Sequence, residues 1–209
     1  YNIKSFIKIY SKEALKLAKR AVRLSDRTSY AKGTAYGLLN NAVCDFLLSK
    51  DEKLLEKLNS ALSMFEQSGD LTGKAKTLSV IGNVYDNYGN YDSALKNCRQ
   101  GLNIAETTGG KEIESDILNT TGLIYMRLAD YDNSLRAYLK SARIRKGMKN
   151  WTALASSLNQ ISRVYAQQER YNKAMEYYNK SLRLRKEIKD KGGVPWTHIG
   201  IAGLYEKMN

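Results

Sequence analysis

Apolar residues recur along this chain at steps of three and four positions, which is the spacing of one face of an α-helix. The first clear stripe is formed by Leu78, Ile81, Gly82, Val84, Tyr85 and Tyr88. A second stripe follows after a short break and is formed by Tyr91, Ala94, Leu95, Cys98, Leu102 and Ala105. Both segments are therefore predicted to be amphipathic helices.

The two-helix pattern repeats every forty residues. One column of large residues contains Tyr85, Tyr125, Tyr165 and Tyr205. Three residues before it, a column of small residues contains Gly82, Gly122, Ser162 and Ala202. Other columns with the same period hold Tyr91, Tyr131 and Tyr171, then Ala94, Ser134 and Ala174, then Gly101, Ser141 and Ser181. Several columns at one period of this length indicate stacked units of secondary structure.

Short connections separate the predicted helices. Within a repeat they are Gly89-Asn90, Ala129-Asp130 and Glu169-Arg170, and such short connections force two helices to lie antiparallel. Between repeats, glycine that can adopt the helix-ending left-handed conformation stands in Ser68-Gly69-Asp70, Thr108-Gly109-Gly110 and Lys191-Gly192-Gly193. We predict a single array over residues 1–209, with units at 30–69, 70–109, 110–149 and 150–190 and partial units at 1–29 and 195–209.

The columns also predict how the helices pack. Glycine in the middle of a helix costs about 1 kcal/mol relative to alanine. Gly82 and Gly122 are therefore expected where the paired helix comes close. The tyrosines three residues later, such as Tyr125 and Tyr165, are expected to be the large buried side chains of each hairpin.

These columns together resemble the tetratricopeptide repeat. The matching residues are Leu78, Ile81, Gly82, Tyr85, Gly89, Tyr91, Ala94 and Gly101, which recur as Leu118, Gly122, Tyr125, Tyr131, Ser134 and Ser141. The period of forty exceeds the family's usual one of about 34 residues. Arrays with this longer period look like those of bacterial signalling regulators and kinesin light chains. The resemblance implies an all-α fold, a right-handed superhelical α-solenoid of antiparallel helix hairpins.

The resemblance also implies a binding surface. In this family the first helix of each pair lines a concave groove, where a protein or peptide partner is expected to lie. The residues expected to bind it here are Lys76, Asn83, Asn87, Asn119, Met126, Arg127, Asn159, Arg163 and Gln167. Amide side chains can pair with an extended peptide backbone, and arginine can pair with carboxylates. The alternative is that these polar residues only keep an exposed face soluble.

The chain carries a net charge of +13, and much of the positive charge lies between Lys140 and Lys191. Many of these cations stand at the ends of predicted second helices: Arg143, Arg145, Lys146 and Lys149, then Arg183, Arg185, Lys186 and Lys189. Cations at a helix C-terminus are stabilised by the helix dipole, which is the structural interpretation. The alternative is a basic ridge that binds nucleic acid or an acidic protein.

No set of residues suggests catalysis, a metal or a cofactor. His198 is the single histidine, and Cys44 and Cys98 stand far apart without a CxxC pattern. The cysteines are expected to be small packing residues. No apolar window has the length of a membrane span and no signal peptide is visible, so the segment is predicted to be soluble. Free cysteines are compatible with a reducing compartment, and the predicted location is cytoplasmic.

The sequence begins without Met and stops within a repeat, which predicts that it is part of a larger protein. The resemblance to the repeat family and the lack of catalytic residues predict a scaffold without enzyme activity that binds proteins or peptides. Its expected role is the sensing or interaction module of a larger bacterial signalling or regulatory protein. Self-association through exposed terminal helices is a further prediction.

Overall fold

The computed structural model describes residues 3–27, 30–48 and 53–208, with side chains described from Lys12 onward. Ten helices and no strand occur within these ranges, which confirms the predicted all-α fold. In chain order they are α1 (Ile3–Arg27), α2 (Ala31–Leu47), α3 (Leu54–Ser68), α4 (Leu71–Asn87), α5 (Tyr91–Thr107), α6 (Lys111–Arg127), α7 (Tyr131–Gly147), α8 (Trp151–Gln167), α9 (Tyr171–Glu187) and α10 (Gly193–Met208). None of the described helices combines the length and the apolar character that crossing a membrane requires.

The predicted spacing of the helices is present in the structure. Helices α4, α6 and α8 begin forty residues apart, and so do α5, α7 and α9. The first helix of each pair ends at a left-handed residue, with φ of 74° at Gly89 and 58° at Ala129 and Glu169. Asn90 then caps α5, because its side-chain oxygen accepts a hydrogen bond from the backbone N–H of Ser93 at 3.1 Å.

The left-handed residues that end the second helices also recur every forty residues, at positions 69, 109, 149 and 189. Gly69 and Gly109 are left-handed as predicted, with φ of 67° and 70°. The prediction was wrong at the last break, where Lys189 is left-handed with φ of 56° and residues 192–193 are not. Lys149, forty residues earlier, has φ of 57°. The repeat geometry therefore sets the left-handed position, even where a side chain makes it unfavourable.

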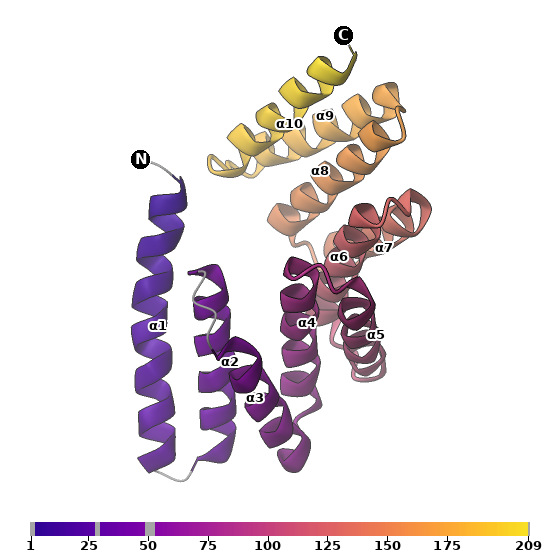
Figure 1. The fold of residues 1–209 in the computed structure, drawn as a ribbon. Helices are drawn as coiled ribbons and strands as arrows, with labels where there is room; N and C mark the ends of the chain where they lie inside the picture. The colour runs from indigo at the N-terminus through magenta and orange to yellow at the C-terminus, as the bar shows by residue number, and fades with distance from the viewer. Residues whose placement is uncertain (1–2, 28–29, 49–52, 209) are drawn as a thin grey trace. The chain divides into compact units, whose positions relative to one another are not determined.

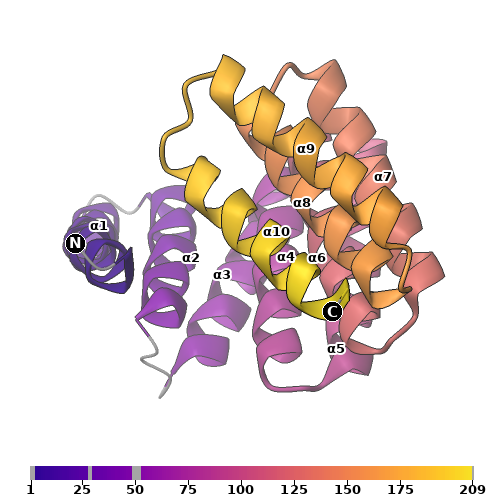
Figure 2. The same ribbon diagram turned by 90° about the horizontal axis from the view of Figure 1, so that it is seen from above.

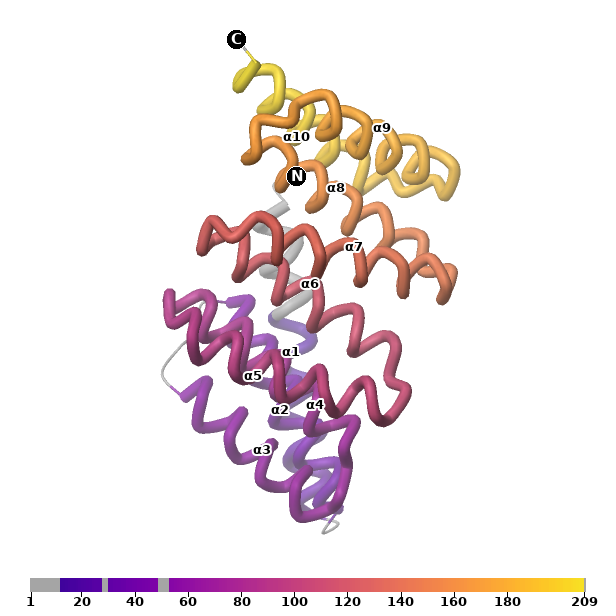
Figure 3. Tube along the Cα trace, turned by 90° about the vertical axis from the view of Figure 1, so that its right-hand side faces the viewer, coloured from indigo at the N-terminus to yellow at the C-terminus, as the bar shows by residue number. Residues whose placement is uncertain are grey.

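Residues 1–109 and 110–209 form two compact units, and each is described by itself. In the first unit each helix from α1 to α4 packs on the helix that follows it (Figures 1 and 3). The fully buried side chains of its core include Leu58, Ala61, Phe65 and Val84. Cys44 and Cys98 are both buried, as predicted for packing residues. Cys98 lies so close to α4 that a Cβ added at Gly82 would come within 2.7 Å of its Sγ.

In the second unit the helices from α6 to α9 pack in the same consecutive way. Helix α10 packs on both α8 and α9, beside which it lies in Figure 2. The buried core of this unit is shared by α7, α8, α9 and α10 and includes Tyr138, Ile161, Val164, Ala174, Tyr178 and Leu204. Helix α8 contacts α7, α9 and α10, so it is the central element of the unit.

Gly122 lies where α7 comes closest to α6. A Cβ added there would come within 2.9 Å of the ring of Tyr138, which bears out the predicted close approach. The predicted tyrosine column is only partly correct: Tyr165 is buried, but Tyr125 is half-buried and Tyr205 is 55% exposed. Tyr138 on α7 instead has no exposed surface. The missing side chain of Gly122 leaves the space that this ring fills.

Glu114 is a buried acid of α6 that is held by two lysines. Its Oε2 accepts a hydrogen bond from Lys111 Nζ at 2.8 Å, and its Oε1 lies 3.3 Å from Lys140 Nζ on α7. Burial alone raises the pKa of Glu114, but the hydrogen bonds from the two lysines outweigh burial. The pKa of Glu114 therefore lies below its ordinary value.

We expect acid to destabilise the second unit partly through Glu114. A carboxyl with a depressed folded-state pKa contributes stability above its unfolded-state pKa, and the contribution is lost as the pH falls through the folded-state pKa. In urea unfolding, Glu114→Gln should therefore lose less unfolding free energy than the wild type between neutral and acidic pH. Glu112→Gln, at an exposed position of the same helix, is the control. The same pH dependence in wild type and Glu114→Gln would contradict this expectation.

Candidate functional site

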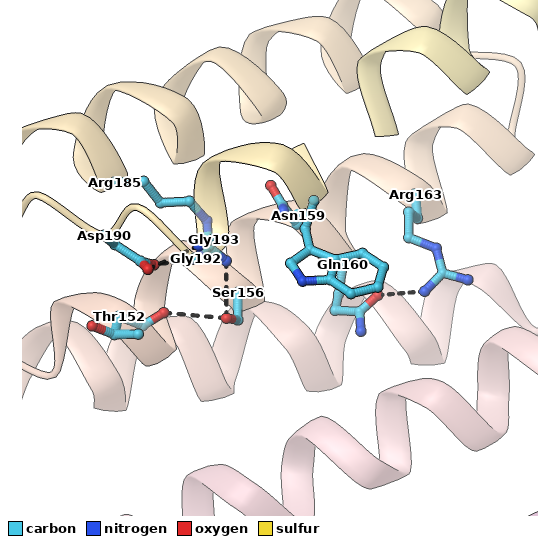
Figure 4. Close-up of a pocket in the computed structure, with 10 residues that line it drawn as sticks. Thr152, Ser156, Asn159, Gln160, Arg163, Arg185, Asp190, Gly192 and Gly193 are labelled. Carbon is cyan, nitrogen blue, oxygen red and sulfur yellow. Dashed lines mark hydrogen bonds and ion pairs between the residues drawn. The ribbon is translucent and has the colours of Figure 1, made fainter. Parts of the chain in front are cut away.

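Two adjoining cavities follow the line along which α8 meets α10 in the second unit. The first, of about 450 Å³, is lined by Thr152, Ser156, Asn159, Gln160, Arg163, Arg185, Asp190, Gly192, Gly193 and Trp196 (Figure 4). The second, of about 400 Å³, is lined by Arg163, Ala166, Gln167, Tyr178, Trp196, Ile199, Gly200, Gly203, Leu204 and Lys207. Arg163 and Trp196 line both cavities, so the two form one surface, which we name the α8–α10 groove.

The first cavity is bordered by a buried ion pair. Arg185 on α9 is 5% exposed, forms an ion pair with Asp190 and donates a hydrogen bond from Nη2 to Ser156 Oγ at 3.1 Å (Figure 4). Asp190 also caps α10, because its Oδ1 accepts a hydrogen bond from the backbone N–H of Gly193 at 2.9 Å. Since the two charges neutralise each other, this end of the groove presents mainly hydroxyl and amide groups.

A second polar contact sets the distance between the walls of the groove. Asn159 Nδ2 on α8 donates a hydrogen bond to Thr197 Oγ1 on α10 at 3.0 Å. Thr197 is completely buried, so this bond is shielded from water. The polar end of the groove is therefore held by side chains from α8, α9 and α10.

The apolar end of the groove carries positive charge at its rim. Arg163 Nη1 donates a hydrogen bond to Gln160 Oε1 at 2.8 Å, and Lys207 donates to Gln167 across the groove. No carboxylate of the described residues pairs with Arg163 or Lys207. Tyr178 is buried beneath them, and burial raises the pKa of its phenol, so this part of the groove floor stays uncharged.

Arg145 occupies the position forty residues before Arg185 and links α6 to α8. It is 6% exposed, its Nη2 lies 2.8 Å from Asp116 Oδ1, and its Nη1 donates to Ser157 Oγ at 2.7 Å. Arg145 and Arg185 lie in the last turns of α7 and α9, as predicted, but their burial excludes them from a basic ridge. The exposed cations of these helix ends include Arg143, Lys146, Arg183 and Lys186.

Residues 114–187 match the family model of the tetratricopeptide repeat. This part of the chain is therefore similar to tetratricopeptide repeats. No curated protein sequence matches it significantly. Its fold is similar to that of BtubC (BKLC) from P. vanneervenii, with a TM-score of 0.80 and 16% identity over 95% of this chain and 84% of that chain.

Two further solved structures share the tetratricopeptide-repeat fold with this chain. A Rap protein complexed with competence and sporulation factor has a TM-score of 0.80 and 15% identity, over 90% of this chain and 53% of that chain. The TPR-like repeats of a putative kinesin light chain from Podosopora anserina have a TM-score of 0.65 and 12% identity, over 90% and 95%. These likenesses show the fold.

The binding residues predicted from the sequence divide into three groups. One group lies on α4 of the first unit and consists of Lys76, Asn83 and Asn87. A second lies on α6, lines neither cavity and consists of Asn119, Met126 and Arg127. The third lines the α8–α10 groove at four-residue steps and consists of Asn159, Arg163 and Gln167. The structure therefore places only the α8 group in the groove.

The predicted residues Asn119 and Asn159 are hydrogen-bonded to side chains of other helices. Asn119 Oδ1 accepts a hydrogen bond from Arg145 at 3.4 Å, and Asn159 is bonded to Thr197. Met126 is partly buried against the apolar core. A role of these three residues in binding stays a prediction.

The wall of the groove that α10 provides was not predicted from the sequence. Trp196 is 53% exposed and Ile199 is 62% exposed, and both line the groove. They stand forty residues after Ser156 and Asn159, so the repeat spacing itself marks them as groove positions. His198 on the same helix is exposed. Among the described residues, no cluster of His, Cys, Asp or Glu could hold a metal ion.

Proposed function

We propose that the chain is a non-catalytic interaction module and that a peptide segment of a partner protein binds in the α8–α10 groove. The observation that carries this proposal is the exposure of Trp196 and Ile199 on one wall, in the cavity that Arg163 lines from the other. Tryptophan and arginine side chains dominate the binding energy of many protein interfaces. An apolar cavity with a few polar groups at its edge is typical of a binding site.

The fold relatives support this proposal. The Rap protein was crystallised in complex with competence and sporulation factor, and the part of it that matches this chain is about half of its length. By the same comparison we propose that this chain is the sensing or interaction module of a larger signalling or regulatory protein.

Removing the indole of Trp196 should weaken peptide binding. Peptides are first selected from a random library against the 209-residue chain, and their affinities are then measured by isothermal titration calorimetry. For Trp196→Ala we expect a loss of affinity of about tenfold or more. Trp151→Ala is the matched control, because Trp151 is also exposed, at 39%, but lines neither cavity. Unchanged binding by Trp196→Ala, or an equal loss in both variants, would overturn the proposed site.

Two alternatives stay predictions. Nucleic acid or an acidic protein could bind the exposed cations at the ends of α7 and α9, and such binding would weaken steeply with salt. Self-association could use the exposed apolar residues of the terminal helices, which include Leu17, Leu24, Ile199 and Tyr205.

A further inference from the structure

Gly203 leaves an open space in the apolar half of the groove. A Cβ added at Gly200, one turn earlier on α10, would come within 2.5 Å of the ring of Tyr178. A Cβ added at Gly203 would meet no atom within 4 Å, although Gly203 lines the same cavity. Gly200 is therefore needed for close packing of α10 on α9, whereas the space beside Gly203 is unfilled.

The surfaces around this space are apolar. Tyr178, Leu204 and Ala166 line it and are themselves buried in the protein. Trp196 and Ile199 line it and are exposed. An apolar side chain that entered the cavity would remove the exposed surface of both residues from water, which is favourable in proportion to the area buried.

The charges at this cavity have one sign. Arg163 and Lys207 line it, and no Asp or Glu does. The acid of the neighbouring cavity, Asp190, is already paired with Arg185. A carboxylate on the ligand would therefore find uncompensated cations there, and arginine binds carboxylates with two parallel hydrogen bonds.

We propose that the partner segment is an acidic peptide with an apolar anchor: a Leu, Ile, Met or Phe side chain enters the cavity beside Gly203, and a neighbouring Asp or Glu pairs with Arg163. This inference rests on the proposed function of the groove. It adds the chemical class of the partner.

Gly203→Phe is designed to fill the cavity. Its new side chain starts in open space, and phenylalanine has a better helix propensity than glycine. A thermal melt at or above that of the wild type shows that the variant is folded, so that a loss of binding is then not due to unfolding. Gly147→Phe is the matched control, because an added Cβ is also unobstructed there and Gly147 lines neither cavity.

The probes are three synthetic pools of short peptides: one mixes Leu, Ile, Met and Phe with Asp and Glu, one replaces the acids by Lys and Arg, and one replaces the apolar residues by Ser. We expect the acidic apolar pool to bind at least about tenfold more tightly than the other two, as loss of an interface hot spot predicts. Gly203→Phe should lose this binding, and Gly147→Phe should keep it. Arg163→Ala, which leaves Lys207 in place, should reduce the preference for the acidic apolar pool over the basic one.

Undiminished binding of the acidic apolar pool to a folded Gly203→Phe variant would overturn the inference, and so would a preference for the basic pool. If library-selected peptides still depend on Trp196 in that case, the proposed function stands and only the partner class is wrong. If no peptide depends on Trp196, both proposals fail.

Discussion

Replacing Tyr138 with alanine is expected to lower the free energy of unfolding of the second unit by about 3–5 kcal/mol, the usual cost of truncating a buried aromatic side chain. Tyr138 has no exposed surface and belongs to the core that α7, α8, α9 and α10 share. Its ring also lies against Gly122, which has no side chain to fill the space that truncation would leave. Because a whole domain is typically stable by only about 5–15 kcal/mol, this single loss should be visible in any urea titration.

Tyr205→Ala is the control for this prediction. The side chain of Tyr205 is 55% exposed, although Tyr205 belongs to the tyrosine column of the repeat. Its truncation should change the unfolding free energy by about 0.5 kcal/mol or less, as for most surface substitutions. Both variants are followed by circular dichroism during urea unfolding. Similar transition midpoints for the two variants would show that burial of Tyr138 does not stabilise the unit.

The second large effect is expected for Arg145→Glu, which should destabilise the unit by about 3–5 kcal/mol, the range for leaving an uncompensated charge buried. The new carboxylate would stand at a position that is only 6% exposed, although the side chain of Asp116 is 60% exposed. The guanidinium of Arg145 is surrounded by oxygen atoms of Asp116, Asn119, Ala153 and Ser157. A carboxylate at this place would face acceptors instead of donors, and it would be repelled by Asp116. Ser157 is completely buried, so no water replaces the missing donors on that side, whereas Asp116 is 60% exposed.

Two further variants separate charge from packing at this position. Arg145→Met keeps a long side chain and should cost less than Arg145→Glu, because an apolar replacement leaves no buried charge. Arg143→Glu reverses a charge at an exposed position of the same helix and should change the unfolding free energy by about 0.5 kcal/mol or less. Equal destabilisation by Arg145→Glu and Arg143→Glu would contradict the buried bridge between α6 and α8.

The helix hairpins could be predicted from the sequence because the residues that place and end each helix lie close together along the chain. Small residues at Gly82 and Gly122 and turns such as Gly89-Asn90 determine where helices touch and end, and both were predicted correctly. The burial of Arg145 and Arg185 could not be read from charge, since arginine is usually exposed. The same column holds Phe65 and Ala105 in earlier repeats, and both are completely buried. Their apolar character is the signal that marks the column as internal.

The candidate site was only partly predictable. The α8 residues Asn159, Arg163 and Gln167 were predicted from the resemblance to a repeat family whose first helices line a groove, and they do line the α8–α10 groove. The cavity itself depends on a contact between helices about forty residues apart and on the space beside Gly203. The sequence pattern does not predict the volume of such a cavity, because the volume depends on the exact positions of the packed helices.

Helix α10 has few buried side chains, chiefly Thr197 and Leu204, and it is held at its start by the contacts of Asp190 and Asn159. Segments with so little buried surface detach from a folded domain at lower free-energy cost than core helices do. Every molecule in which α10 has detached lacks one wall of the groove. If a partner binds the groove as proposed, its apparent affinity scales with the fraction of molecules in which α10 is docked, and stiffening the attachment of α10 would tighten binding without any new contact to the ligand.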